Sequence, residues 1–182
     1  FDIKIDGTTG EVTLTQYLSL YHPDTDDPND SVQLKNGLIT AKVTVTDADG
    51  DKDVADVDVG ALFTFYDDGP TAALDLVDDA SISVDETADD DDVTGALGQA
   101  TADLVTSAAS VYGADGAGTT AFSLVLSAAG ADSGLKLTNE TVIKLYDNNG
   151  TIEGRAGDEN GAVAFDIKID GTTGEVTLTQ YL

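Results

Sequence analysis

The eighteen residues FDIKIDGTTGEVTLTQYL at positions 1–18 recur without change at positions 165–182. A match of that length does not arise by chance, so we infer that the parent chain is built from copies of one unit. The spacing between the copies, 165 − 1 = 164 residues, is then the repeat period. The chain accordingly holds one period plus an overlap, and its ends need not coincide with domain boundaries.

Composition bounds the partners that this chain can have. Eight Lys and Arg residues stand against thirty-five Asp and Glu residues, which gives a net charge of −27 at pH 7. This charge repels nucleic acid and anionic membrane surfaces, whereas multivalent cations relieve the repulsion among the carboxylates. Oxygen ligands of this kind favour hard ions, so Ca²⁺ is the expected cofactor. The alternative is an acidic surface that serves solubility alone.

The residue types that the chain lacks exclude several kinds of site. The chain contains no Cys, which excludes disulfides and thiolate metal sites, and its single histidine is His22. No serine is visibly partnered with that histidine and no phosphate-binding glycine loop is present, so we do not expect an enzyme. No apolar run approaches twenty residues, so direct membrane insertion is not expected either.

Strand signals dominate the sequence. Residues 1–6 and 11–18 alternate apolar and polar side chains around the turn GTTG, which predicts a β-hairpin. Residues 38–47 and 53–65 predict a second hairpin around Asp49-Gly50. Further strands are predicted at 81–85, 119–128, 134–138, 141–147 and 163–169. Together these signals predict an all-β fold, an antiparallel β-sandwich of immunoglobulin-like type.

One stretch departs from the strand pattern. Residues 88–118 are rich in Ala, Gly, Ser, Thr and Asp, and they predict a long irregular loop. Within it, residues 98–110 (GQATADLVTSAAS) are the place where we expect a short helix or a turn-rich excursion.

A boundary is predicted at residues 67–70 (DDGP), because Pro70 cannot donate to a continuing ladder. Residues 1–66 would then be the C-terminal part of one repeat and residues 71–182 the N-terminal part of the next. The two parts could pack as one permuted domain or exchange strands with neighbouring molecules, and both copies of the duplicated hairpin would compete for one structural position. Alternatively, DDGP is an internal turn.

Four aspartates follow one another at every second position in TDADGDKD: Asp47, Asp49, Asp51 and Asp53. On a tight loop these carboxylates can converge on one Ca²⁺, with backbone carbonyls and water completing six to eight ligands. The spacing is not that of an EF-hand, because Lys52 stands where that motif requires glycine. A hairpin with a solvated acidic turn remains the alternative.

Two other acidic groups are candidate ligands. Asp67 and Asp68 at the predicted boundary, together with Asp85 and Glu86 after the strand at 81–85, could hold a calcium ion that stops the junction from bending; the alternative is a plain acidic linker. The proline-stiffened loop HPDTDDPND carries Asp24, Asp26, Asp27 and Asp30 beside His22. A lone loop histidine is more often a surface or packing residue than a ligand. The charge run Asp89–Asp92 is typical of a solvated loop.

Several spaced segments, in the same circular order, resemble one known class of repeat: HPDTDDPNDSV, VTVTDADGD, FYDDGP, ISVDET and YGADGAGTTAFSLVLSAAGADSGL. Over essentially its full length the chain resembles the long tandem repeats of giant repeats-in-toxin (RTX) adhesins, which are exported by type I secretion and act in adhesion and biofilm formation. The secretion nonapeptide with its double glycine and aspartate is not present, as expected of an extender rather than an export module.

The resemblance implies a non-catalytic β-sandwich extender at the bacterial cell surface, stiffened by calcium, with neighbouring repeats of the same chain as its partners. The alternative is a carbohydrate- or protein-binding module of the same adhesin. A unit that is used many times favours spacing, whereas a unique domain would favour ligand binding.

Overall fold

The fold of the chain, given by a computed structural model, is all-β, and the structure describes residues 1–86 and 95–182. Every strand pairing is antiparallel, as the sequence predicts. Two compact units divide the chain: Phe1–Thr71 with Val111–Ala117, and Ala72–Ser110 with Gly118–Leu182. We call them unit 1 and unit 2.

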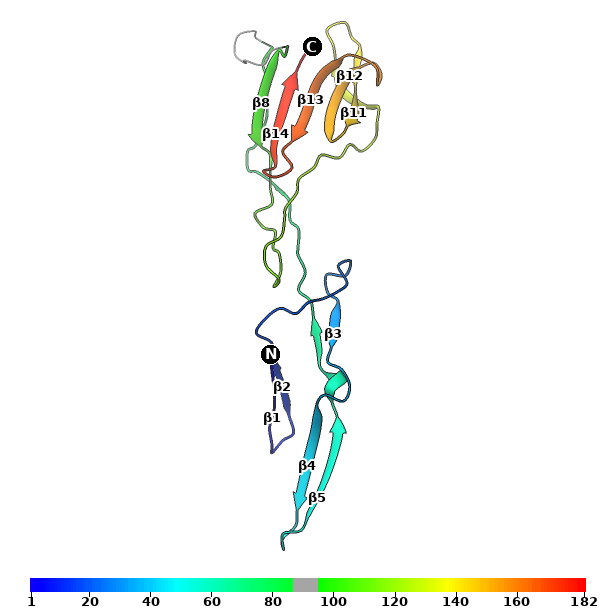
Figure 1. Cartoon of the computed structure of the whole chain (residues 1–182). Coiled ribbons are helices and arrows are strands. Elements are labelled where there is room, and N and C mark those ends of the chain that lie inside the picture. Colours follow the sequence, from blue (N-terminus) through cyan, green and yellow to red (C-terminus); the bar gives the residue numbers. More distant parts are fainter. Residues whose placement is uncertain (87–94) are drawn as a thin grey trace. The chain divides into compact units, whose positions relative to one another are not determined.

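Unit 2 contains a six-stranded sheet, most of whose strands lie side by side in Figure 1. Strands β10 to β14 follow one another as a meander, and β8 pairs with the outer edge of β14. In sheet order the strands are β10 (Ala131–Lys136), β11 (Val142–Asn148), β12 (Thr151–Ala156), β13 (Val163–Ile169), β14 (Glu175–Gln180) and β8 (Gly98–Asp103). A short pair, β7 (Asp75–Leu76) and β9 (Val105–Thr106), completes the unit.

The register separates the two faces of this sheet. Ile152, Ile167 and Leu178 are successive cross-strand partners, so their side chains share one apolar face. The buried apolar side chains of the sheet are Ile143, Ile152, Ala164 and Val176. Burial of these apolar side chains contributes to the stability of unit 2.

The opposite face carries a row of buried polar side chains. Glu153 pairs with Asp166, and Asp166 pairs with Thr179 across the strands. Each has a partner: Arg155 Nε donates to Glu153 Oε2 at 2.7 Å, Tyr181 donates to Asp166 Oδ2 at 2.9 Å, and Gln99 Nε2 donates to Thr179 Oγ1 at 3.0 Å. These bonds offset the desolvation of the two adjacent carboxylates.

Unit 1 is built from two-stranded pairs. The pairs are β1 (Asp2–Ile5) with β2 (Val12–Thr15), β3 (Ser31–Gln33) with β6 (Thr64–Tyr66), and β4 (Thr40–Thr46) with β5 (Lys52–Asp58). A 3₁₀ turn at Gly60–Leu62 leads into β6, where Phe65 is buried and packs against Phe1 with ring centroids 5.0 Å apart. Both hairpins predicted in residues 1–66 are therefore confirmed.

Two of the predicted strands do not form, because their backbones pair with no neighbouring strand in the described structure. Residues 81–85 and 119–128 belong to no strand, although burial still alternates along them: Ile82, Val84, Phe122 and Leu124 are partly buried between exposed neighbours. The period-two pattern thus indicates which side chains face inward. A ladder also requires a neighbouring strand about 4.8 Å away, and the pattern contains no information about that.

The short helix or turn-rich excursion expected at 98–110 is also wrong, because residues 98–103 form β8 and 105–106 form β9. The alanines of β8 favour a helix locally, but six residues of β8 pair in register with β14. Small side chains suit this position because a Cβ at Gly98 would lie 2.9 Å from the Asp85 carbonyl oxygen. Tertiary pairing therefore overrides propensity here.

The two copies of the duplicated segment form the same turn. Asp6 Oδ1 accepts the amides of Thr8 and Thr9, both at 2.8 Å, and Asp170 Oδ1 accepts those of Thr172 and Thr173 at 2.8 and 2.7 Å. The amide of Thr9, then that of Thr8, lowers the pKa of the Asp6 carboxyl below its ordinary value, and the amides of Thr173 and Thr172 lower the pKa of Asp170 in the same way.

Candidate metal centre

The strongest candidate for a metal centre is the turn that joins β4 to β5. Asp47 Oδ1 accepts the Asp51 amide at 2.8 Å and the Gly50 amide at 3.0 Å, while the Asp47 amide donates to the Asp51 carbonyl at 3.0 Å. Gly50 has φ of 103°, a conformation that side chains disfavour. These bonds fix a tight loop on which alternate side chains project together.

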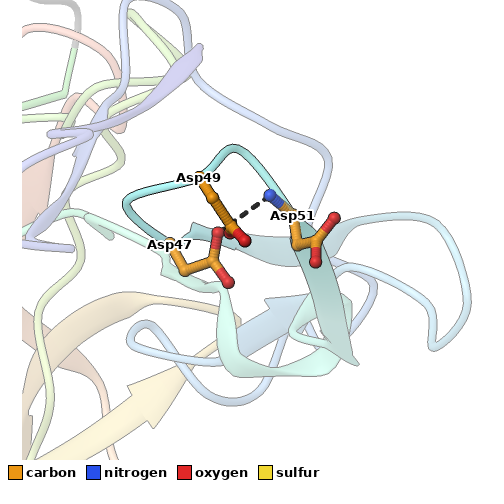
Figure 2. A group of neighbouring side chains, drawn as sticks. All are labelled: Asp47, Asp49 and Asp51. Carbon is orange, nitrogen blue, oxygen red and sulfur yellow. Dashed lines mark hydrogen bonds between the residues drawn. The ribbon is translucent and has the colours of Figure 1, made fainter.

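Three carboxylates converge on this loop. One oxygen each from Asp47, Asp49 and Asp51 lies within 4.8 Å of the others, and all three residues are exposed (Figure 2). Calcium binds oxygens at about 2.3–2.6 Å, so ligands around one ion lie at most about 5 Å apart. The three carboxylates therefore fit Ca²⁺, and water or backbone oxygens would complete its coordination.

Among the three carboxyls of this loop, Asp47 has a shifted pKa. The pKa of its carboxyl lies below the ordinary value, chiefly because of a hydrogen bond with the Asp49 carboxyl; burial raises it, and the amides of Asp51, Gly50 and Asp49 lower it further. Asp47 is consequently ionised at neutral pH and held in a fixed orientation by amide donors.

Asp53, the fourth member of the predicted series, lies apart from this group. It is on β5 opposite Val45, and its Oδ1 accepts the amide of Val54 at 2.9 Å. The loop thus brings together three of the four predicted ligands, since the fourth is already part of the ladder.

The carboxylates predicted to clamp the junction lie in different units. In unit 1, Asp67 Oδ1 accepts the Asp68 amide at 2.9 Å. In unit 2, Glu86 Oε1 accepts the side-chain amide of Gln180 at 2.7 Å, and Asp85 precedes it. A calcium ion shared between these groups stays a prediction.

In the loop at residues 22–30, the carboxylates of Asp24 and Asp30 form hydrogen bonds with other residues of the same loop. His22 Nδ1 lies 2.5 Å from Asp30 Oδ1, and Asp30 Oδ2 accepts the Asp24 amide at 3.0 Å. Asp24 Oδ1 in turn accepts the Asp26 amide at 3.1 Å. The His22 side chain is 4% exposed, so it is a buried side chain paired with Asp30. The charge run Asp89–Asp92 lies outside the described residues.

Sequence reasoning missed an apolar hollow on the sheet of unit 2. Its volume is about 630 Å³, and its lining includes Leu135, Leu137, Ile143, Phe165, Ile167 and Leu178. The alternation of β13 and β14 indicates an apolar face, but where that face stays open depends on pairing distant in sequence.

The protein is thus a strongly acidic, all-β chain that contains an internal repeat and an acidic turn. It belongs to a family described as a domain of unknown function (DUF5801), which matches residues 1–60 and 81–182. Neither a curated protein nor a solved structure matches it. Within the described residues, we find no helix of sufficient length and apolarity to span a membrane.

Proposed function

We propose that this chain is a non-catalytic, calcium-stabilised extender repeat of a bacterial surface adhesin of the RTX type, exported by type I secretion. It would project a distal ligand-binding region from the cell for adhesion and biofilm formation. The observation that carries the proposal is the recurrence of one 18-residue segment after 164 residues, in two copies that adopt the same hairpin. A unit repeated at fixed spacing suits the separation of two distant ends.

Calcium has a mechanical part in this proposal. The chain carries a net charge of −27, so neighbouring repeats repel one another unless counterions intervene. An ion on Asp47, Asp49 and Asp51 would stiffen the β4–β5 hairpin, which has little packing of its own. A second ion at the junction would keep successive repeats from folding back.

The extender function predicts a constant length increment for each repeat. Chains of one, two and three 164-residue periods should gain equal amounts in maximum dimension in calcium, as measured by small-angle X-ray scattering. In chelator the gain for each period should decrease, because flexible joints lose end-to-end distance to entropy. Compact multi-period particles in calcium would contradict the extender function.

Calcium binding predicts a specific rise in melting temperature. A ligand at about 100 times its Kd stabilises the native state by about 2.7 kcal/mol, which shifts the Tm of a small domain by about 10 °C or more. Asp49→Asn should remove most of this rise. Asp53→Asn is the matched control, because it removes the same charge from the same series but not from the converging group.

Differential scanning calorimetry of both variants, in calcium and in sodium of equal ionic strength, makes the comparison. Equal shifts in the two salts, or equal losses in the two variants, would reduce the effect to general charge screening.

The apolar hollow of unit 2 favours a second candidate, a binding module of the same adhesin. Among the described residues that line it, Phe165 is the only aromatic one, whereas carbohydrate sites usually offer stacking aromatics, so a protein segment is the better ligand. A module of this kind has no need for equal length increments, so the scattering experiment separates the two candidates.

A further inference from the structure

The two copies of the hairpin show the same part of the repeat in two different surroundings, with the same register in both ladders. In unit 2 the copy at 165–182 lies between β12 and β8. In unit 1 the copy at 1–18 is followed along the chain by residues 19–66. A chain built from copies of this unit therefore continues past Leu182 with a copy of residues 19–66. By the same repetition, the strands that flank β1–β2 lie before Phe1.

The apolar hollow of unit 2 lies where that continuation begins, because Leu182 lines it together with Phe165 and Ile167. Phe165 and Ile167 are two positions apart on β13, so both belong to the apolar face of the sheet. An antiparallel sheet with one apolar face requires a second layer over that face. The hollow marks a part of the face that the described residues leave uncovered.

Unit 1 shows which side chain covers the same residue of the repeat. Phe1 is the counterpart of Phe165, and the ring of Phe65 packs against Phe1 with centroids 5.0 Å apart. Phe65 lies on β6, within the segment 19–66, and is 3% exposed. The same contact, made by the continuing chain on Phe165, would place an aromatic ring in the hollow.

Two segments of unit 2 indicate a second layer that needs further strands. Residues 81–85 and 119–128 alternate partly buried and exposed side chains, yet they belong to no strand. This alternation is typical of strands that cover an apolar face, but a ladder also needs a neighbouring strand. The continuation supplies strands, because residues 31–66 contain the pairs β3–β6 and β4–β5.

The β4–β5 hairpin has the pattern that an outer layer requires. Val43, Val45 and Val57 lie on one face and are more than half exposed, whereas Lys42 and Asp56 pair on the other face. In a sandwich, such a hairpin turns its apolar face to the core and its charged face to water.

We propose that the copy of residues 19–66 that follows Leu182 closes the apolar hollow of unit 2, with its copy of Phe65 packed against Phe165. One complete domain of the repeat then consists of unit 2 and this continuation. The proposal rests on the sequence repeat and not on the adhesin function. It fills the hollow from within the protein, so it leaves no site there for the separate ligand of the second candidate function.

The test extends the full chain, so that residues 1–182 are followed by a second copy of residues 19–66. Amide-exchange protection in β13 and β14 should be at least about tenfold higher in the extended chain than in the chain of 182 residues, because both strands gain a covering layer. Equal protection in the two chains would overturn the proposal. This comparison needs no substitution, so it does not depend on whether a variant folds.

Phe65→Ala in the second copy should abolish this gain in protection. The same substitution in the first copy is the matched control, because that Phe65 packs against Phe1 in unit 1. It should destabilise unit 1 and leave the protection of β13 and β14 unchanged. A loss from the first copy that equals or exceeds the loss from the second would overturn the proposal.

A double-mutant cycle in the extended chain tests the contact itself. Phe165→Ala and Phe65→Ala in the second copy should be non-additive in the free energy of unfolding, because the two rings touch. The cycle of Phe1→Ala with Phe65→Ala in the first copy is the internal reference, since that contact is present in unit 1. Additive losses at Phe165 and the second Phe65, beside coupling in the reference cycle, would also overturn the proposal.

Discussion

Val176→Ala should lower the free energy of unfolding of unit 2 by about 2 kcal/mol, because two buried carbons at about 0.8 kcal/mol each are lost and a small cavity remains. Val12→Ala, the same change in the identical sequence 164 positions earlier, should stay within about 0.5 kcal/mol. Val176 is 4% exposed between β8 and β13, and Val12 is 45% exposed. Urea unfolding followed by amide hydrogen exchange in β13 and β14 measures the difference.

This pair isolates the effect of surroundings, since the two valines share every neighbour in sequence. Equal losses at the two positions would contradict the burial difference. They would mean that the N-terminal hairpin is also seated in a sheet.

Gly113→Ala should detach the segment Val111–Ala117 from the rest of unit 1 and destabilise that unit by about 3 kcal/mol. Gly113 has φ of 79°, and a Cβ there would lie 1.8 Å from the carbonyl oxygen of Asp68. The change therefore adds a backbone clash to the strain of a left-handed residue. It should also break the bond from the Ala114 amide to the Asp68 carbonyl, 3.3 Å long.

Gly116→Ala is the matched control in the same segment. Gly116 has φ of 94°, but nothing lies within 4 Å of an added Cβ, so only the backbone strain of about 1 kcal/mol should appear. Thermal unfolding of both variants, with amide exchange at Val111 and Thr71, gives the comparison. Similar effects at the two glycines would show that the segment does not lie against Asp68.

The parts of the fold that could be predicted are those that local sequence specifies. The turn GTTG, with Gly10 at φ of 74°, and the Asp49-Gly50 turn define hairpins without outside help. The strand at 163–169 was predicted with its observed bounds. By contrast, β12 (Thr151–Ala156) carries Glu, Gly and Arg in succession, so its strand conformation arises from pairing on both edges.

The ligands of the candidate metal centre likewise fall into those that local sequence predicts and those that it does not. Asp47, Asp49 and Asp51 could be predicted to converge because one tight turn positions all three. Asp53 could not be excluded from sequence alone, since its separation depends on where the turn ends and β5 begins at Lys52. Grouping Asp67 and Asp68 with Asp85 and Glu86 requires a long-range arrangement that no local pattern encodes.

The β4–β5 hairpin has a consequence for how this protein behaves in acid. Val43, Val45 and Val57 share one face of the hairpin and are all more than half exposed, and neither outer strand edge is paired within residues 1–86 and 95–182. Like charges keep such edges apart in neutral solution. The sequence pI is about 4.1, so acidification to that point removes the repulsion while leaving the apolar face and free backbone groups in place. Colloidal dispersion of this chain is thus tied to the ionisation of its carboxylates, and we expect self-association through this hairpin only when the pH falls to about the pI.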